Sequence, residues 1–159
     1  MKLFLISAAV AVVAVVSYAG SAQAQDIYAG VAVDYNKPHS GTDQQAASLL
    51  LGGSMDMGTF SIGVEADYGA AATFGGDYDT ARLRLMGGFD LGSVTAIGAI
   101  GGTRFMQDAG NADGYNIGVG LQGAVSNSID LRGEMIRDFM ADEFGTNVTT
   151  TRISAIYSF

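Results

Sequence analysis

The sequence predicts an all-β protein, a single eight-stranded antiparallel up-and-down β-barrel whose strands cross a membrane. From residue 26 onward, apolar and polar residues alternate with a period of two, the spacing of a strand with one apolar face. The alternation divides into eight runs of about ten residues, the length that a tilted strand needs to cross a hydrocarbon layer. No run of about 18 apolar residues follows the N-terminal segment, so we expect no membrane-spanning helix there.

The composition narrows the possible functions before any motif is considered. The chain has 159 residues, no cysteine, and 16 acidic against 8 basic residues, for a formal charge of −8. Disulfides and cysteine-ligated metals are therefore excluded, and the acidic charge argues against binding to nucleic acid through its phosphates. Beyond residue 24, Lys37 is the only lysine, whereas a soluble domain has charged residues over about a quarter of its surface or more. We infer that much of the outer surface does not face water.

The N-terminal segment has the organisation of a cleavable export signal. Lys2 supplies a positive charge, residues 3–16 form an apolar stretch, and residues 22–24 (Ala-Gln-Ala) give the small-x-small pattern that precedes cleavage. The alternative, a retained anchor helix, is disfavoured because a spanning helix needs about 20 apolar residues. We therefore predict a signal peptide over residues 1–24 and an outer-membrane-type barrel domain over residues 25–159.

The eight expected strands are connected alternately by tight turns and longer loops. Tight turns are expected near Met57, Gly92 and Asn127, and two of the four longer loops over residues 69–77 and 106–113. An even number of strands joined in this way puts both ends of the barrel domain at the tight-turn end. The expected strands cover residues 26–36, 46–56, 59–68, 81–90, 94–105, 115–125, 129–139 and 148–159.

The facing of the fifth strand is the least clear, because its apolar residues do not share one parity. Ile97 and Phe105 lie on one face, whereas Val94 and Ile100 lie on the other. We choose the parity that directs Phe105 outward and Arg104 into the barrel.

Aromatic residues on the apolar face gather near both ends of the expected barrel. Two such rings, flanking a band of aliphatic residues, are typical of a wall that faces lipid. A soluble barrel would direct its apolar face inward instead. The ring at the loop end contains Tyr35, Tyr68, Phe105, Tyr115 and Phe139, and the ring at the turn end contains Phe60, Phe89, Tyr157 and Phe159.

The opposite face carries small residues interrupted by charges, as expected of a narrow lumen. We expect Glu65 to lie near Arg82, with Arg84 one step away, and Glu134 to lie near Arg152. Two interpretations stay open: the charges fill the lumen as structural ion pairs, or they line a gated pore. The predicted lumen network consists of Glu65, Arg82, Arg84, Arg104, Arg132, Glu134 and Arg152.

The C-terminal segment, residues 152–159, ends in Phe159 with Tyr157 two positions before it. Together with the eight alternating runs, it resembles the eight-stranded outer-membrane barrels of the OmpA, OmpX and opacity-protein superfamily, small barrels also described as porin-family proteins. The resemblance implies a place in the Gram-negative outer membrane, in contact with its lipids and lipopolysaccharide. It also implies insertion by the barrel assembly machinery, which would read Tyr157 and Phe159, with help from periplasmic chaperones. The loops are shorter than those of adhesive members.

Few residues suggest catalysis or metal binding. His39, the single histidine, is followed by Ser40, and the pair resembles loop-side residues of outer-membrane lipid-modifying enzymes. Adjacent residues on an extended chain point apart, however, so we do not expect a nucleophile and its base here. Residues 108–114 resemble a calcium-binding loop but lack the acids that it requires. We therefore predict no catalytic, cofactor-binding or metal-binding residues.

The loops carry an excess of acids at the expected membrane surface. We hypothesise that divalent cations bridge these acids to lipopolysaccharide phosphates, and that Arg137 contacts a phosphate directly. The acidic loop residues are Asp43, Asp77, Asp108, Asp113, Asp142 and Glu143, against the single base Lys37.

Taken together, these patterns favour an integral outer-membrane barrel that supports the envelope, has a lumen filled by side chains and needs no cofactor. The first alternative is a narrow porin-like channel for small solutes. The second is an outer-membrane lipid-modifying enzyme. An eight-stranded lumen is normally filled by side chains, which favours the structural function over the channel.

Overall fold

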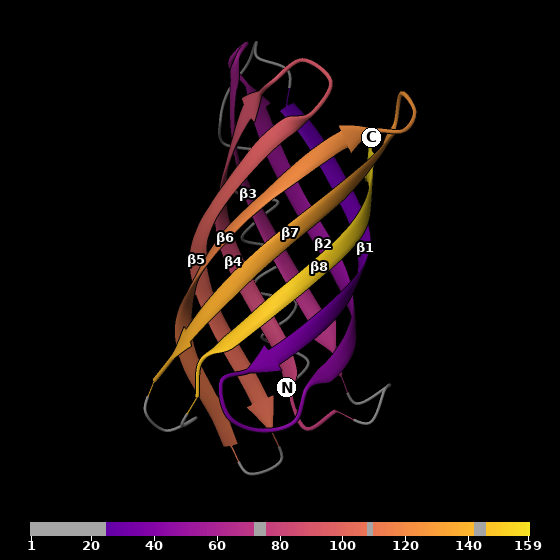
Figure 1. The fold of residues 1–159 in the computed structure, drawn as a ribbon. Helices are drawn as coiled ribbons and strands as arrows, with labels where there is room; N and C mark the ends of the chain where they lie inside the picture. The colour runs from indigo at the N-terminus through magenta and orange to yellow at the C-terminus, as the bar shows by residue number, and fades with distance from the viewer. Residues whose placement is uncertain (1–24, 72–75, 108–109, 142–145) are drawn as a thin grey trace.

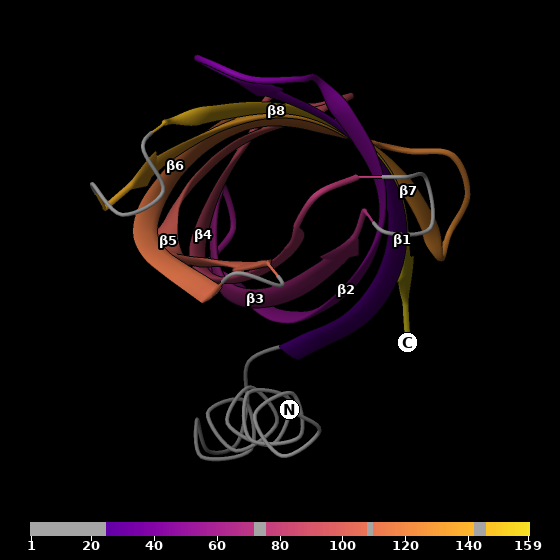
Figure 2. The ribbon, with the colours of Figure 1, turned by 90° about the horizontal axis from the view of Figure 1, so that it is seen from below.

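The structure, a computed structural model, describes residues 25–71, 76–107, 110–141 and 146–159. Each strand pairs antiparallel with its neighbours in sequence, and β1 pairs with β8, so the sheet closes into the expected eight-stranded barrel (Figures 1 and 2). The strands are β1 (Gln25–Pro38), β2 (Gln44–Asp56), β3 (Phe60–Ala70), β4 (Asp79–Asp90), β5 (Thr95–Gln107), β6 (Gly110–Ala124), β7 (Ile129–Met140) and β8 (Val148–Ser158).

The β2–β3, β4–β5 and β6–β7 turns lie at one end of the barrel, which we name the turn end. The C-terminus lies there too, because Ser158 at the end of β8 faces Tyr28 near the start of β1 (Figure 1). Two of these turns share one local structure. Asp56 Oδ1 accepts the amide of Gly58 at 2.7 Å, and Asp90 Oδ1 accepts the amide of Gly92 at the same distance. Both glycines have a positive φ, 89° and 97°, which a side chain would disfavour.

The outer wall of the barrel is apolar. Val31, Leu49, Val119 and Ile153 each expose between 58% and 66% of their surface, far more than core residues of a soluble domain expose. Charged residues are nearly absent from this wall along the middle of the strands, because the alternation directs them inward. In the part of the chain that the structure describes, no helix has the length and apolar character needed to cross a membrane.

The interior holds the charges, so the polarity of the barrel is the reverse of that of a soluble domain. Arg84, Arg152 and Glu65 are at most 1% exposed and are among the largest side chains that are fully buried. A buried ion is costly unless partners compensate it, so the ion pairs among these side chains decide whether the fold is stable.

The parity expected for the fifth strand is wrong. Phe105 is 0% exposed and stacks on Tyr78 inside the barrel, with ring centroids 4.6 Å apart. Its neighbour Arg104 points outward, where its side chain is 36% exposed. The sequence pattern of this strand is ambiguous because it carries apolar residues on both faces, and the inward Phe105 packs against Tyr78 in the segment that precedes β4.

The connection between the fifth and sixth strands is also shorter than expected. The loop predicted over residues 106–113 is mostly strand: β5 continues to Gln107, β6 starts at Gly110, and these two residues are register partners. Gly110 adopts a φ of 145°, which lets a polar sequence close a narrow hairpin. The predicted export signal, residues 1–24, lies outside the described residues.

Candidate functional site: the barrel lumen

Arg84 is at the centre of the lumen, held between two carboxylates. Its Nη2 donates to Glu65 Oε1 and also to Glu134 Oε2, the latter at 3.1 Å, while Nη1 donates to Glu134 Oε1. Glu65 is the register partner of Arg84 rather than of Arg82, one pair away from the expected register. The guanidinium fork therefore joins β3, β4 and β7 across the barrel.

A second group of ion pairs lies on the loop side of Arg84. Arg152 makes a bidentate contact with Asp34, at 2.7 and 2.8 Å, and its Nη2 also donates to Asp67 at 2.8 Å. Arg82 makes a bidentate contact with Asp138, at 3.1 and 2.8 Å, and reaches Asp67 at 3.3 Å. Asp67 thus bridges two arginines that come from strands on different sides of the lumen.

On the turn side of Arg84, Glu65 binds two further groups. Its Oε2 accepts a hydrogen bond from Arg132 Nη1 at 2.6 Å and another from the Tyr28 hydroxyl at 3.0 Å. The Arg132 guanidinium also lies over the Tyr28 ring, 5.7 Å from its centroid, a cation–π contact. Arg132 and Tyr28 form the boundary between the network and the open turn end.

Six of the seven residues predicted for the lumen network lie together there, and Arg104 does not. Arg104 instead makes a bidentate contact with Asp113 on the outside, at 2.6 and 2.8 Å. Glu134 and Arg152 face each other across the β7–β8 ladder as expected, but Glu134 binds Arg84 across the lumen. Arg152 binds Asp34, its register partner on β1, and also Asp67 across the lumen. Sequence reasoning left out Tyr28, Asp34, Asp67 and Asp138 as network members, although their inward parity was a usable signal.

The network nearly balances its charge in a space without bulk water. Five carboxylates and four guanidinium groups of the described residues are buried within it. Each of the four arginines contacts at least one carboxylate within 4 Å. The acids are Asp34, Glu65, Asp67, Glu134 and Asp138, and the arginines are Arg82, Arg84, Arg132 and Arg152.

The loop end of the lumen is filled by apolar side chains. Tyr78, Phe105 and Val148 form a buried cluster, with Met140 packed against it. Gln44 holds the segment before β4 in place, because its side chain accepts the amide of Asp77 at 2.9 Å and donates to the carbonyl of Tyr78 at 3.3 Å. This cluster covers the charged network on the loop side.

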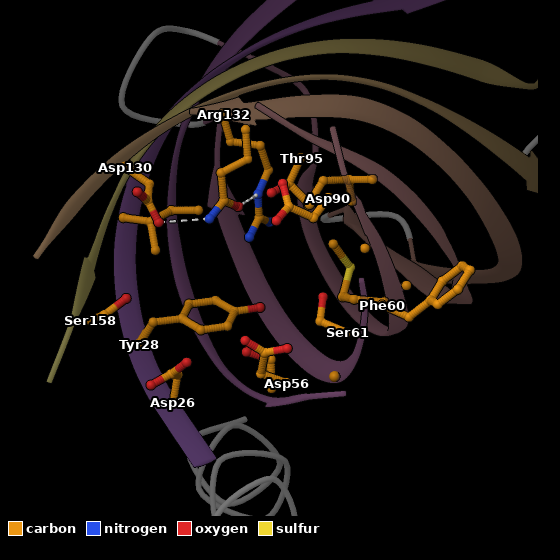
Figure 3. Close-up of a pocket in the computed structure, with 18 of the residues that line it drawn as sticks. Asp26, Tyr28, Asp56, Phe60, Ser61, Asp90, Thr95, Asp130, Arg132 and Ser158 are labelled. Carbon is orange, nitrogen blue, oxygen red and sulfur yellow. Dashed lines mark hydrogen bonds between the residues drawn. The ribbon is translucent and has the colours of Figure 1, made fainter. Parts of the chain in front are cut away.

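The turn end of the lumen holds a cavity of about 230 Å³, enough for several water molecules at about 30 Å³ each (Figure 3). The labelled acids Asp26, Asp56, Asp90 and Asp130 surround it, with Tyr28 and Arg132 pointing toward its inner end. Three of these acids have local partners: Asp56 and Asp90 accept backbone amides in the turns, and Asp130 accepts a hydrogen bond from Gln122 at 2.7 Å.

The predicted aromatic rings are observed on the outer wall, with the exception of Phe105. At the turn end, Phe60 lies against Phe89 with centroids 4.9 Å apart, and Tyr157 lies 5.2 Å from Phe159. The remaining members lie at the loop end, where Tyr115 and Phe139 stack at 4.9 Å, the Tyr35 hydroxyl donates to Asp43, and the Tyr68 hydroxyl donates to Asp79 at 2.7 Å.

The loop residues considered for catalysis lie apart from the lumen. His39 and Ser40 are exposed, and their backbone amides donate to the carbonyl of Asn147 and the hydroxyl of Thr146. Among the described residues, no group of three or more histidine or acidic side chains is placed to hold a metal ion. Three of the acids considered for cation bridging, at positions 108, 142 and 143, lie outside the described residues.

Comparisons with known proteins identify the fold. No protein-family model and no curated protein matches the sequence. Among solved structures, neisserial surface protein A matches with a TM-score of 0.60 and 11% identity, over 87% of this chain and 100% of that one. Ail, the attachment invasion locus protein of Yersinia pestis, matches with a TM-score of 0.61 and 12% identity, over 87% and 100%.

The N-terminal β-barrel domain of Pseudomonas aeruginosa OprF matches with a TM-score of 0.59 and 10% identity, over 86% of this chain and 100% of that one. At these identities the likeness concerns the fold. Strand number, antiparallel order and closure are shared along almost the whole described chain. The chain has the fold of the eight-stranded outer-membrane β-barrels.

Proposed function

We propose that this protein is an integral outer-membrane barrel that supports the bacterial envelope mechanically and has a lumen closed by its own side chains. The observation that carries the proposal is the reversed polarity of the barrel. An exposed band of aliphatic residues between two aromatic rings is unfavourable in water and favourable in a bilayer. The export signal predicted over residues 1–24 accounts for the route out of the cytoplasm.

The content of the lumen supports a sealed barrel over a channel. Along the axis from the loop end, the Tyr78–Phe105 stack is followed by two groups of ion pairs, all almost fully buried. Conduction would require several of these contacts to open together. Because removing one partner of a buried ion pair typically costs about 3–5 kcal/mol, such opening is rare.

The geometry also supports a function without catalysis. The amides of His39 and Ser40 are tied to the neighbouring loop, and both side chains are exposed, whereas a nucleophile and its base must lie within hydrogen-bond reach in a water-shielded site. Replacing His39 with Ala should leave the mass of lipid A in the producing strain unchanged, and a mass shift would assign a lipid-modifying activity instead.

Biogenesis follows from the same proposal. Tyr157 and Phe159 are exposed at the end of β8, where the barrel assembly machinery would read them after delivery by periplasmic chaperones. The loop end would then lie in the outer leaflet, among lipopolysaccharide molecules. Loop acids such as Asp43 would bind their phosphates through divalent cations, so EDTA should lower the thermal stability of the barrel in native-lipid extracts and excess calcium should restore it.

The first test is gel migration of the membrane fraction with and without boiling. A folded outer-membrane barrel resists the detergent of the gel and migrates differently from its unfolded form, so we expect two bands that interconvert on heating. The mature chain should also require an amphiphile to stay monomeric. A compact monomer in plain buffer, with no detergent or lipid, would contradict the proposal.

The second test separates the sealed barrel from the porin-like channel. Purified protein in a planar bilayer should show no stable conductance above that of a protein-free membrane. The double variant Phe105→Gly with Tyr78→Gly, which removes the aromatic stack and keeps the charged network, is measured for comparison. A raised conductance in this variant would show that the charged network alone does not seal the lumen. Steady conductance of the unaltered protein would assign the channel function.

A further inference from the structure

Two arginines lie on the outer wall near the loop end, and they differ in their partners. Arg104 on β5 is neutralised by the bidentate contact with Asp113 described above. Arg137 on β7 has no acidic partner within 4 Å among the described residues. The comparison is informative because both side chains lie near the same membrane interface.

The contacts of Arg137 with other described residues leave most of its donors unused. Its Nη1 donates to the Thr149 hydroxyl at 2.5 Å, and its guanidinium lies 5.9 Å from the centroid of the Phe139 ring. A guanidinium presents five N–H donors, and neither contact neutralises its charge. A cation on an apolar wall is unfavourable unless it reaches water or an anion. We therefore expect a negatively charged group from outside the protein to bind at this position.

An apolar groove runs along the outer wall beside this arginine. Its loop-side part is lined by Leu83, Tyr115 and Ile117. Its turn-side part is lined by Ile62 and again by Ile117. Both parts share Leu85 and Ile100, so they form one continuous depression.

Two glycines leave the turn-side part of the groove open. Gly87 and Gly98 are register partners on β4 and β5, and both face outward. A Cβ at Gly98 would meet no atom within 4 Å, so the space above it is open. No side-chain atom therefore covers the backbone over Gly98, and an apolar chain can lie against it there.

The cation and the groove adjoin each other. Ile117, which lines the groove, is the register partner of Arg137, and Tyr115, at the loop end of the groove, is the partner of Phe139. An anionic site directly beside an apolar channel matches one class of ligand, an amphiphile with a charged headgroup and long acyl chains.

We propose that the outer wall carries a specific site for lipid A: a phosphate of its headgroup binds Arg137, and one of its acyl chains lies in the groove over Gly87 and Gly98. The choice of lipid A rests on the proposed function. An outer-membrane barrel with its loop end in the outer leaflet places Arg137 in that leaflet, where lipid A is the phosphorylated lipid. A charge-assisted contact to phosphate supplies the anion that the wall lacks.

The test measures lipid binding by native mass spectrometry of the full barrel released from detergent micelles. The probes are lipid A, lipid A from which the phosphates have been removed, and phosphatidylglycerol. We expect lipid A to bind at least about tenfold more tightly than its dephosphorylated form, the factor that one charge-assisted contact supplies.

Three variants locate the site. Arg137→Gln should lose about tenfold in affinity for lipid A and become indifferent to its phosphates. Arg104→Gln, the matched control, should bind within about twofold of the unaltered protein, because Asp113 already satisfies that arginine. Gly98→Val should weaken lipid A and its dephosphorylated form by the same factor, because the new side chain fills the groove and leaves Arg137 untouched.

Several results would overturn the proposal. These are equal binding of lipid A and its dephosphorylated form, equal binding of phosphatidylglycerol, equal losses in the two arginine variants, or a lipid-free dimer that buries Arg137. Heat-modifiable migration of each variant is checked first. If the bands still interconvert on heating but lipid A binds no more tightly than its dephosphorylated form, the proposed lipid site is wrong and the proposed outer-membrane barrel is not affected. If the bands do not interconvert for the unaltered protein, the proposed function fails as well.

Discussion

The middle of the lumen and its turn end are lined by the same kinds of residue, yet they differ in packing. In the middle, Arg84 and Arg152 each contact two or more carboxylates, and their side chains are fully buried. At the turn end, Asp56 and Asp90 accept hydrogen bonds from nearby backbone amides, and a cavity of about 230 Å³ remains.

The difference shows that inward parity alone does not make a charge structurally important. A carboxylate that bridges the lumen leaves an uncompensated guanidinium behind when it is removed, and water cannot enter to replace it. A carboxylate beside the cavity can be replaced by water, for which the cavity has room. Variants at Glu65, Tyr28 and Asp130 test this contrast, and a variant at Phe105 tests the facing of the fifth strand.

The largest effect is expected for Glu65→Ala, which leaves both Arg84 and Arg132 without this partner. The unfolding free energy in detergent micelles should fall by about 3–5 kcal/mol, with a lower urea midpoint. Glu65→Gln, which keeps the size but not the charge, should also be destabilised. An unchanged midpoint would show that Glu65 does not stabilise the fold, and the proposed difference between the middle of the lumen and its turn end would be wrong.

A second large effect is expected for Phe105→Ala in the loop-end cluster. Emptying this site should cost about 3 kcal/mol, near the lower limit for a buried aromatic residue, because the loop end can admit some water. Ile100→Ala on the opposite parity of β5 is the matched control. It should cost less, because Ile100 is 59% exposed on the outer wall, where detergent fills the space that the shortened side chain leaves and no cavity forms. Equal losses of unfolding free energy in the two variants would contradict the inward position of Phe105 and favour the outward position expected from the sequence.

An intermediate effect is expected for Tyr28→Phe at the boundary of the two regions. The change removes only the hydroxyl that donates to Glu65 at 3.0 Å, a hydrogen bond to a charged group, and should cost about 1.5–3 kcal/mol. A loss comparable to that of Glu65→Ala would show that the buried network extends further toward the turn end than the cavity suggests.

The smallest effect is expected for Asp130→Asn beside the cavity. Its hydrogen bond with Gln122 can be replaced by water, so the unfolding free energy should change by no more than about 0.5 kcal/mol. The measurement is the same urea titration. A loss above about 2 kcal/mol would show that carboxylates at the turn end stabilise the fold as strongly as those in the middle of the lumen, and the proposed difference between the two regions would be wrong.

The sequence by itself determined the strand count, the direction of most side chains and the aromatic rings, because each follows from a period of two read along one chain segment. The outward position of Leu49 and the inward position of Arg132 are examples. Where the period is ambiguous, as around Phe105, the sequence is compatible with either face of the strand pointing inward. The contact with Tyr78, which precedes β4, decides which face does so.

Only the tertiary structure decided which charges meet. Arg152 faces both Asp34 and Glu134 along the sheet, but it binds Asp34 and, across the lumen, Asp67. Arg84 binds Glu134 from a strand three positions away in the chain order. Long guanidinium side chains reach across a narrow lumen as readily as along the ladder, so partners depend on barrel closure and strand stagger. Those quantities belong to the whole barrel, and no local stretch of sequence contains them.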